Sequence, residues 1–317
     1  MTLVHPSGFP DVSDPDLARS EFPFTPADFA RIAEIMATEC GIVLDVGKMP
    51  LVYSRLAKRL RTLRVQTFRR YCAFVSSDDG ADERRLMVET LTTNVTRFFR
   101  EKHHFDHLRE KVLPDLLEAA RRGGRVRLWS AGCSSGEEAY SIGFTILDLM
   151  PDAARFDIRV LGTDIDTQML GLARAGLYPD AAVTAIDRGL RDRWMHVRQD
   201  GEGPPSWEVG DPLRSLVAFR TANLIDETWP MRGPFQVIFC RNVVIYFNAD
   251  TRQRVLGRLV NLLSPAGHIY IGHAERLPPD AADLSFVGLT TYRRGTRGAF
   301  RPGSGNRDPY GVRQEHE

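Results

Sequence analysis

The sequence predicts an α/β protein built on a doubly wound, Rossmann-like parallel sheet with helices on both faces. Apolar runs of strand length occur at 126–131, 158–163 and 235–240, each followed by an amphipathic helical segment. Segment 25–90 shows the apolar spacing of helices, which predicts a small all-helical domain before the sheet. Segment 177–216 is broken by prolines and glycines, which predicts an inserted small β-subdomain.

The sheet is organised around one strand–turn–helix unit. Val126–Ala131 has the length of a buried strand, a turn of small residues follows it, and an amphipathic helix begins at Glu137. Doubly wound domains form their nucleotide crevice at such a unit. Gly132 and Gly136 have no Cβ, so we expect a ligand to approach the backbone closely there.

The acidic residue at this turn indicates what kind of ligand would bind. A dinucleotide site offers backbone N–H groups to a pyrophosphate, but the G-x-G-x-x-G pattern of such sites is absent here. The carboxylate of Glu137 would repel phosphate and attract the ammonium and sulfonium groups of S-adenosylmethionine. An alternative stays open at this point, because Glu137 and Glu138 could instead only complement the dipole of their helix.

Composition limits the classes of protein and partner. The chain has 317 residues, enough for two domains, and 43% of them are hydrophobic. The formal net charge is +1, so no global field recruits nucleic acid. The apolar runs are shorter than a membrane span and no signal pattern is present, so we expect no membrane insertion. The four cysteines form no CxxC pair, which is typical of reduced thiols in the cytoplasm.

The N-terminal part predicts a helical domain with one basic helix. Residues 1–24 are expected to form a disordered tail. Thr25 and Pro26 begin a helix that Gly41 ends, and a second helix follows Pro50. The second helix carries the cations Arg55, Lys58, Arg59, Arg61 and Arg64. Because no acidic residue is interspersed among them, we expect an anionic partner rather than only a solvated face.

The remainder of the chain predicts the large domain at 91–296, followed by a disordered tail at 297–317. Further strands are expected at 216–222 and 267–272, and a hairpin is expected at 284–294. Asp164 ends the second strand, where a carboxylate can accept hydrogen bonds from both ribose hydroxyls of a nucleotide. Asp166 is expected to be only the N-cap of the next helix.

Three histidines lie in the segment that joins the two domains. His103, His104 and His107 suggest a metal site, but no Cys, Asp or Glu completes a clear ligand set in the sequence. We therefore expect no metal and place these histidines on a helix that links the domains.

With these residues in view, the sequence resembles the CheR family of chemotaxis-receptor methyltransferases, which are S-adenosylmethionine-dependent protein-glutamate O-methyltransferases. The resemblance covers roughly residues 25–294. It is carried by stretches in a common order: TNVTRFFRE, WSAGCSSGEEAYSI, GTDIDTQML, Asn223-Leu224, FCRNVVIYF and IGHAE at 271–275. Such agreement is more specific than a single glycine turn. It implies a class I methyltransferase sheet, S-adenosylmethionine as cofactor, S-adenosylhomocysteine as product and a cytoplasmic location.

The resemblance also implies roles for individual residues. Asp164 would hold the ribose, and Glu137 would hold the charged methionine end. Arg100 and Tyr246 would lie nearest the transferred methyl group as the catalytic residues. The implied cofactor-binding set comprises Asn94, Thr96, Arg100, Glu137, Asp164, Asn223, Leu224, Arg241 and Asn242.

The resemblance implies a chemoreceptor as partner. The basic helix would face the acidic methylation helix of the receptor. In some members the inserted β-subdomain also binds a short peptide at the C-terminus of the receptor. The insertion here contains GEGPPSWEVGD and departs from the glycine pattern of that binding, so peptide tethering stays open.

Other functions are weighed against this one. A DNA amino-methyltransferase would carry an Asp/Asn-Pro-Pro-aromatic loop after the strand at 235–240, where this chain has RNVVIYF. A dehydrogenase would need the missing pyrophosphate loop. A non-catalytic module that binds S-adenosylmethionine or S-adenosylhomocysteine in a chemosensory pathway stays open as the alternative. The polar residues at the implied contacts, which are all but Leu224, favour the enzyme.

Overall fold

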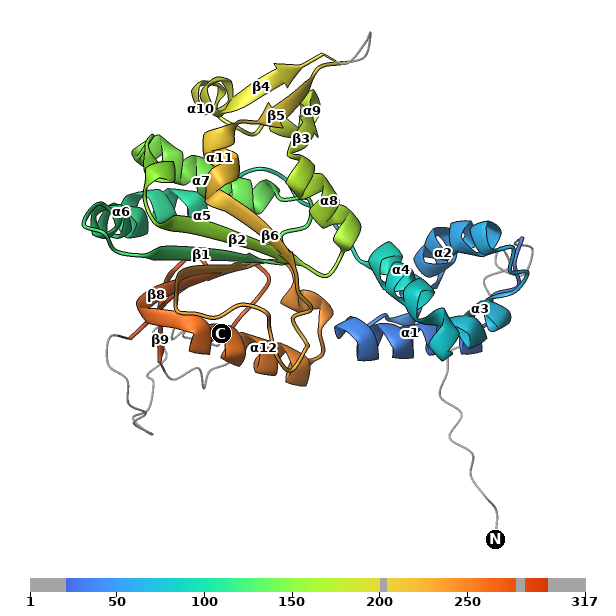
Figure 1. The fold of residues 1–317 in the computed structure, drawn as a ribbon. Coiled ribbons are helices and arrows are strands. Elements are labelled where there is room, and N and C mark those ends of the chain that lie inside the picture. Colours follow the sequence, from blue (N-terminus) through green and yellow to red (C-terminus); the bar gives the residue numbers. More distant parts are fainter. Residues whose placement is uncertain (1–20, 200–203, 278–282, 296–317) are drawn as a thin grey trace, which may run out of the picture.

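The computed structural model describes residues 21–199, 204–277 and 283–295. A group of N-terminal helices lies beside a larger α/β domain, from which a small sheet projects (Figure 1). The expected tail at 297–317 lies outside the described residues, as does most of the expected tail at 1–24.

The N-terminal domain is all-helical, as predicted. Its helices are α1 (Pro26–Cys40), α2 (Met49–Leu63), α3 (Phe68–Val75) and α4 (Ala81–Leu91), with single turns at Val46–Lys48 and Asp78–Gly80. Thr25 caps α1 through a capping box with Asp28, and Gly41 ends the helix in the left-handed conformation with φ 75°. Both ends of α1 therefore lie where the sequence places them.

Residues 22–24 differ from the expected tail. Phe22 and Phe24 are buried in the core of the helical domain, and the ring centroids of Phe24 and Phe68 are 4.2 Å apart. Burying two aromatic side chains stabilises this segment by more than ordering a few residues costs. The polar composition of the residues before it conceals this packing signal.

The large domain is built on a mixed, mainly parallel sheet with the strand order β6-β2-β1-β7-β8-β10-β9. Its parallel strands are β6 (Val217–Thr221), β2 (Ile158–Asp164), β1 (Val126–Ala131), β7 (Phe235–Cys240) and β8 (Leu263–Ile271). The hairpin of β9 (Leu284–Gly288) and β10 (Thr291–Arg294) closes one edge, and β10 pairs antiparallel with β8. The predicted strands and hairpin are confirmed. β8 begins earlier than the strand expected at 267–272, and its pairing with β7 shifts register between Phe235, which pairs with Leu263, and Val237, which pairs with His268.

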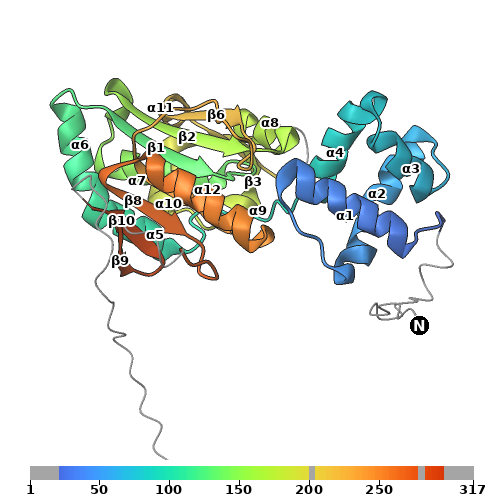
Figure 2. The ribbon, with the colours of Figure 1, turned by 90° about the horizontal axis from the view of Figure 1, so that it is seen from below.

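Helices cover both faces of this sheet (Figure 1). One face carries α5 (Lys102–His107), a π-helical turn (Leu108–Val112), α6 (Leu113–Arg121), α7 (Glu137–Leu149) and α8 (Thr167–Ala175). The other face carries α12 (Ala249–Leu262), which lies across the strands in Figure 2. The two faces bury separate apolar clusters, as a doubly wound domain requires. No helix in the described part of the chain has the length and apolar character needed to cross a bilayer.

The insertion forms a small antiparallel sheet with the order β3-β5-β4. It contains β3 (Leu177–Pro179), α9 (Asp180–Val183), α10 (Arg188–Trp194), β4 (Met195–Arg198), β5 (Ser206–Val209) and α11 (Asp211–Leu216). It is more helical than its irregular sequence suggests, because Asp187 and Pro212 begin helices there that are too short to show a clear period.

Candidate active site

A cavity that is partly open to solvent lies at the carboxyl ends of the strands β6, β2, β1 and β7. The chain turns away from the sheet at this edge, so residues distant in sequence converge there. All but one of the implied cofactor-binding residues line this cavity, together with Tyr246. The lining residues from that set are Asn94, Thr96, Arg100, Asp164, Asn223, Leu224, Arg241 and Asn242.

Asp164 is the last residue of β2 and lies at this edge of the sheet, where it lines the cavity. Its Oδ2 accepts a hydrogen bond from the backbone N–H of Ser134 (2.7 Å), and its Oδ1 accepts one from Asp166 (3.0 Å). Burial raises the pKa of the Asp164 carboxyl, while these two N–H groups act in the opposite direction. Each carboxylate oxygen keeps a second lone pair that can accept a ligand hydroxyl.

Asp166 is the N-cap of α8, as the sequence predicts. Its Oδ1 accepts hydrogen bonds from the backbone N–H groups of Gln168 and Met169. Its Oδ2 accepts a hydrogen bond from Asn94 Nδ2 at 2.7 Å. The cap therefore also fixes the orientation of Asn94, which lines the cavity from the segment that joins the two domains.

The two glycines of the turn after β1 have a packing role that the sequence analysis missed. A Cβ at Gly132, whose φ is 82°, would lie 2.3 Å from Val243 Cγ2. A Cβ at Gly136, whose φ is 96°, would lie 2.8 Å from Ala173 Cβ. Neighbouring side chains and the left-handed conformation therefore demand glycine at both positions. The expected close approach of a ligand is not needed to explain either residue.

The two acidic residues at the start of α7 have different environments in the structure. Glu138 lines the cavity, whereas Glu137 does not. Glu137 accepts a hydrogen bond from Ser135 Oγ at 2.7 Å, and burial raises the pKa of its carboxyl. Successive helical residues point about 100° apart, so only one of two adjacent carboxylates can face the same space. The glycine-turn motif alone gave no means of choosing between them.

Glu138 belongs to a buried ion pair with Arg241. Arg241 Nε lies 2.7 Å from Glu138 Oε2, and Glu138 Oε1 accepts a hydrogen bond from Ser130 Oγ at 2.6 Å. Arg241 also donates to the backbone carbonyl of Arg100 at 2.6 Å. The guanidinium of Arg241 is therefore bound within the protein, and this network fixes the backbone beside Arg100.

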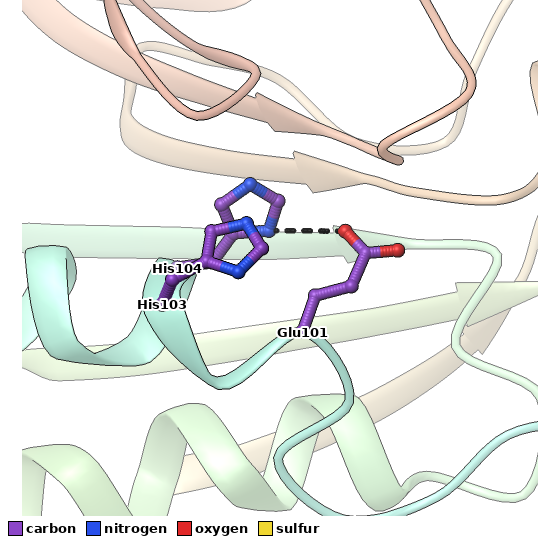
Figure 3. A group of neighbouring side chains, drawn as sticks. All are labelled: Glu101, His103 and His104. Atoms are coloured by element: carbon purple, nitrogen blue, oxygen red, sulfur yellow. Dashed lines mark ion pairs between the residues drawn. The ribbon is translucent and has the colours of Figure 1, made fainter.

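The three groups Glu101, His103 and His104 lie side by side in Figure 3, with their ligand atoms within 4.8 Å of one another. The expectation that no Cys, Asp or Glu completes a ligand set is therefore wrong, since Glu101 lies beside His103 and His104. However, His104 Nδ1 accepts a hydrogen bond from Arg241 at 3.0 Å, and Nε2 donates to the carbonyl of Leu289. Because Arg241 is a cation and takes the lone pair of the ring, the geometry opposes metal binding here.

His104 is a neutral member of this network. Burial and the neighbouring Arg241 lower its pKa to about 4. The three histidines lie on α5, but this helix does not link the two domains as predicted. The residues that join the domains, 92–101, precede α5 and are not helical, and α5 packs in the core of the large domain.

The N-terminal domain contributes directly to the cavity. Cys40 and Ile42 line it, although they lie far from the sheet in sequence. Ile42 forms an antiparallel bridge with Phe247, and the N–H of Val43 donates to the carbonyl of Tyr246 at 2.9 Å. No sequence motif could reveal this contact, because it depends on how the two domains pack.

The remaining implied residues lie at the edges of the cavity. Asn223 follows β6, and its Nδ2 donates to the backbone carbonyl of Glu39 at 2.7 Å. Arg100 is half-buried and donates to the carbonyl of Val95 at 2.9 Å, which leaves other guanidinium N–H groups for a ligand. Tyr246 is also half-buried.

The basic helix α2 is less available than its sequence suggests. Arg55 donates to the carbonyls of Leu91 (2.9 Å) and Thr92 (2.7 Å) at the end of α4. Arg59 pairs with the buried Glu83, and Arg61 pairs with Glu21. Lys58 and Arg64 are exposed, and no ion pair is found for either among the described residues. The acidic partners come from outside the run of cations, so the local charge count overestimates the positive surface.

The cofactor fits the groups around this cavity. Carboxylates of Asp164 and Glu138 suit the hydroxyl and cationic parts of S-adenosylmethionine, and the apolar side chains of Ile42, Leu224 and Phe247 suit a flat base. The mixed sheet with its cavity at the strand ends is the architecture of Rossmann-like methyltransferases.

Two family models match the chain in succession. "CheR methyltransferase, all-alpha domain" matches residues 27–92, and "CheR methyltransferase, SAM binding domain" matches residues 94–293. The chain therefore belongs to the CheR family of chemotaxis protein methyltransferases, enzymes that use S-adenosylmethionine as the methyl donor.

Named relatives are similar in sequence to this chain along most of their own length. A "Probable chemotaxis protein methyltransferase" of Rhizobium etli is 47% identical over 83% of this chain and 98% of the relative. "Chemotaxis protein methyltransferase 2" of Pseudomonas aeruginosa is 38% identical over 88% of this chain and 96% of the relative. "Chemotaxis protein methyltransferase" of Escherichia coli is 37% identical over 84% and 90%.

Proposed function

We propose that this enzyme transfers a methyl group from S-adenosylmethionine to glutamate side chains on the cytoplasmic helices of chemoreceptors. The observation that carries the proposal is the cavity at the strand ends, where the carboxylates of Asp164 and Glu138 converge beside Arg100 and Tyr246. The names of the relatives support the chemotactic role. Four buried free cysteines support action in the cytoplasm.

Within the proposal, Asp164 accepts hydrogen bonds from the ribose hydroxyls, and Asn94, Thr96, Asn223, Leu224 and Asn242 surround the rest of the cofactor. The structure favours Glu138 over Glu137 as the carboxylate nearest the charged methionine end, since only Glu138 lines the cavity. Arg241 acts through Glu138 and Arg100, because its own N–H groups are bound to them.

The reaction needs no general base from the protein. An unperturbed glutamate has a pKa of about 4.3, so the substrate is already anionic at neutral pH. S-adenosylmethionine, when bound, supplies an electrophilic methyl on a sulfonium. The carboxylate and the sulfonium both lose charge as they react, so a cavity that excludes water favours the transition state.

The main task of the protein is then positioning. Arg100 and Tyr246 are half-buried at the cavity, where they can orient the incoming carboxylate. A permanent Arg–carboxylate clamp would stabilise the ground state as well, so Arg100 guides rather than clamps the nucleophile.

The acidic methylation helix of the receptor docks on α2 in this proposal. Lys58 and Arg64 provide the exposed charge, Arg55 and Arg59 serve mainly to hold the helical domain together, and Glu21 offsets the charge of Arg61. Electrostatic attraction at such a surface raises the association rate more than the affinity, and salt weakens it.

The test is transfer of a labelled methyl group to a purified receptor cytoplasmic fragment, compared with a fragment whose methylation-helix glutamates are replaced by glutamine. We expect base-labile label only on the first fragment, and slower transfer by Tyr246→Phe and Arg100→Ala. Equal labelling of both fragments would contradict glutamate as the acceptor. If Arg100→Ala changed neither turnover nor cofactor affinity, the role of Arg100 would be wrong.

A further inference from the structure

Glu275, outside the set of implied site residues, has an unusual environment. Its side chain is 2% exposed, and no cation of the described residues lies within ion-pair distance of it. Its two carboxylate oxygens instead accept hydrogen bonds from four backbone N–H groups. The donors are Asn242 (3.1 Å), Val243 (3.2 Å), Ile245 (3.3 Å) and Gly272 (2.5 Å).

Three of these donors belong to the loop that follows β7. The same loop carries Asn242 and Tyr246, which line the cavity. Asn242 has φ 59°, a left-handed conformation that Asn adopts more readily than most other non-glycine residues. Glu275, which follows β8, holds this loop through hydrogen bonds to its backbone.

We propose that Glu275 is a positioning residue for catalysis: its carboxylate holds the loop 242–246 so that Asn242 and Tyr246 face the cofactor. The ionised form suits this task, because a carboxylate only accepts hydrogen bonds and all four partners only donate. Burial raises the pKa of Glu275, whereas the four N–H groups act in the opposite direction.

The surrounding packing supports this assignment. A Cβ at Gly272 would lie 2.7 Å from Asn242 Nδ2 and 2.8 Å from Glu275 Oε2. The strand end, the carboxylate and the loop are therefore in close contact. From the opposite side, the N–H of Val43 holds the carbonyl of Tyr246. The loop is thus fixed between the helical domain and Glu275.

This inference rests on the proposed placement of Asn242 and Tyr246 at the cofactor. Glu275→Gln keeps the size of the side chain but turns one acceptor into an NH₂ donor, which opposes the N–H groups of the loop. Displacement of a catalytic loop by about 1 Å can cost on the order of 100-fold in rate. We expect kcat to fall by about that factor and the Kd for S-adenosylhomocysteine to rise by roughly tenfold.

The experiment combines calorimetric titration with S-adenosylhomocysteine and methyl-transfer kinetics, both on full-length protein. The binding stoichiometry counts folded molecules, so kcat can be expressed for those molecules alone. The matched control is Asp28→Asn, another buried carboxylate that accepts a backbone N–H bond, far from the cavity in α1. That control should lower stability but leave kcat and Kd unchanged.

The outcomes separate this inference from the proposed function. If Asn242→Ala and Tyr246→Phe alter binding or turnover but Glu275→Gln alters only stability, the positioning role is wrong. If Asn242→Ala and Tyr246→Phe alter neither, the placement of the cofactor itself is wrong.

If Glu275→Gln does not fold, Gly272→Ala decides the question, because its methyl group would press on Glu275 and Asn242 while the charge stays. A rise in Kd and a fall in kcat would then support the role of Glu275. Unchanged values would overturn it.

Discussion

The cavity and the surface of α2 are both rich in charge, but they use it differently. In the cavity, Glu138 and Arg241 are buried and bound to each other, so their positions are fixed. On α2, Arg59 and Arg61 are neutralised by acids from elsewhere, and the exposed charge is reduced to residues such as Lys58. Motif positions therefore predict a site at strand ends better than local charge predicts a binding surface.

The largest loss of stability is expected when Arg241, the cation of the buried ion pair at the cavity, is removed. Arg241→Ala leaves the carboxylate of Glu138 buried without a cationic partner, although the hydrogen bond from Ser130 remains, and removes the donor to the carbonyl of Arg100. The free energy of unfolding should fall by about 3–5 kcal/mol, as measured in urea. Arg61→Ala, which breaks the exposed pair with Glu21, is the matched control and should cost less than about 1 kcal/mol. Equal losses of unfolding free energy in the two variants would show that the buried pair at the cavity and the exposed pair on α2 do not differ in their contribution.

Variants of Glu137 and Glu138 in α7 test which of the two carboxylates contributes more to cofactor binding. Glu138→Gln should weaken S-adenosylmethionine binding by roughly tenfold or more, because it removes a negative charge that faces the cavity. Glu137→Gln should have a smaller effect, since its carboxylate does not line the cavity. Calorimetry on both variants checks this order. A larger loss from Glu137→Gln would restore the sequence-based assignment.

The cations of α2 should separate into structural and binding residues. Arg55→Ala should lower the free energy of unfolding by about 1–3 kcal/mol, because it removes charge-assisted hydrogen bonds to the carbonyls of Leu91 and Thr92. Lys58→Ala should change stability by less than about 0.5 kcal/mol. Urea unfolding gives both values.

Lys58→Ala should also change the rate of methyl transfer to a receptor fragment. We expect slower transfer than in the wild type at low salt and no difference at high salt. No salt-dependent difference from the wild type would exclude Lys58 from the docking surface.

A separate expected effect is the pH dependence of stability that His104 contributes. Its pKa is about 4 in the folded protein and about 6.5 when unfolded. The unfolded state therefore binds more protons between these values, so stability is fully present above about pH 6.5 and is lost as the pH falls toward 4. The loss should approach about 1 kcal/mol per pH unit within that window.

The comparison must be made against His104→Gln, because Asp164 and Glu275 have raised pKa values and contribute with the opposite sign. Urea unfolding at about pH 7 and about pH 5 should show the wild type losing more stability than the variant. If the wild type and the variant lost the same stability between the two pH values, His104 would not be held neutral by burial and Arg241.

Much of this architecture could be predicted from local patterns. The cap at Thr25, the acid at Asp164 and the N-cap at Asp166 depend only on neighbouring residues, and the structure places all three as expected. The choice of Glu138 over Glu137 depends on the rotation of a helix, which the motif does not encode. The pairing of Arg59 with Glu83 depends on the packing of α2 against α4.

The same limit applies to residues that contact the loop after β7 from distant parts of the chain. Ile42 and Glu275 both make such contacts, and neither contact joins sequence neighbours. Residues of this kind are found only when tertiary packing is known.

The most direct test of the account is calorimetric titration of S-adenosylhomocysteine into the wild type, Asp164→Ala and the α2 variant Lys58→Glu. The account predicts that Asp164→Ala abolishes binding while remaining folded, and that Lys58→Glu binds as tightly as the wild type. If Asp164→Ala bound the ligand with unchanged affinity, the cofactor would not lie at the strand ends and the central claim would be contradicted.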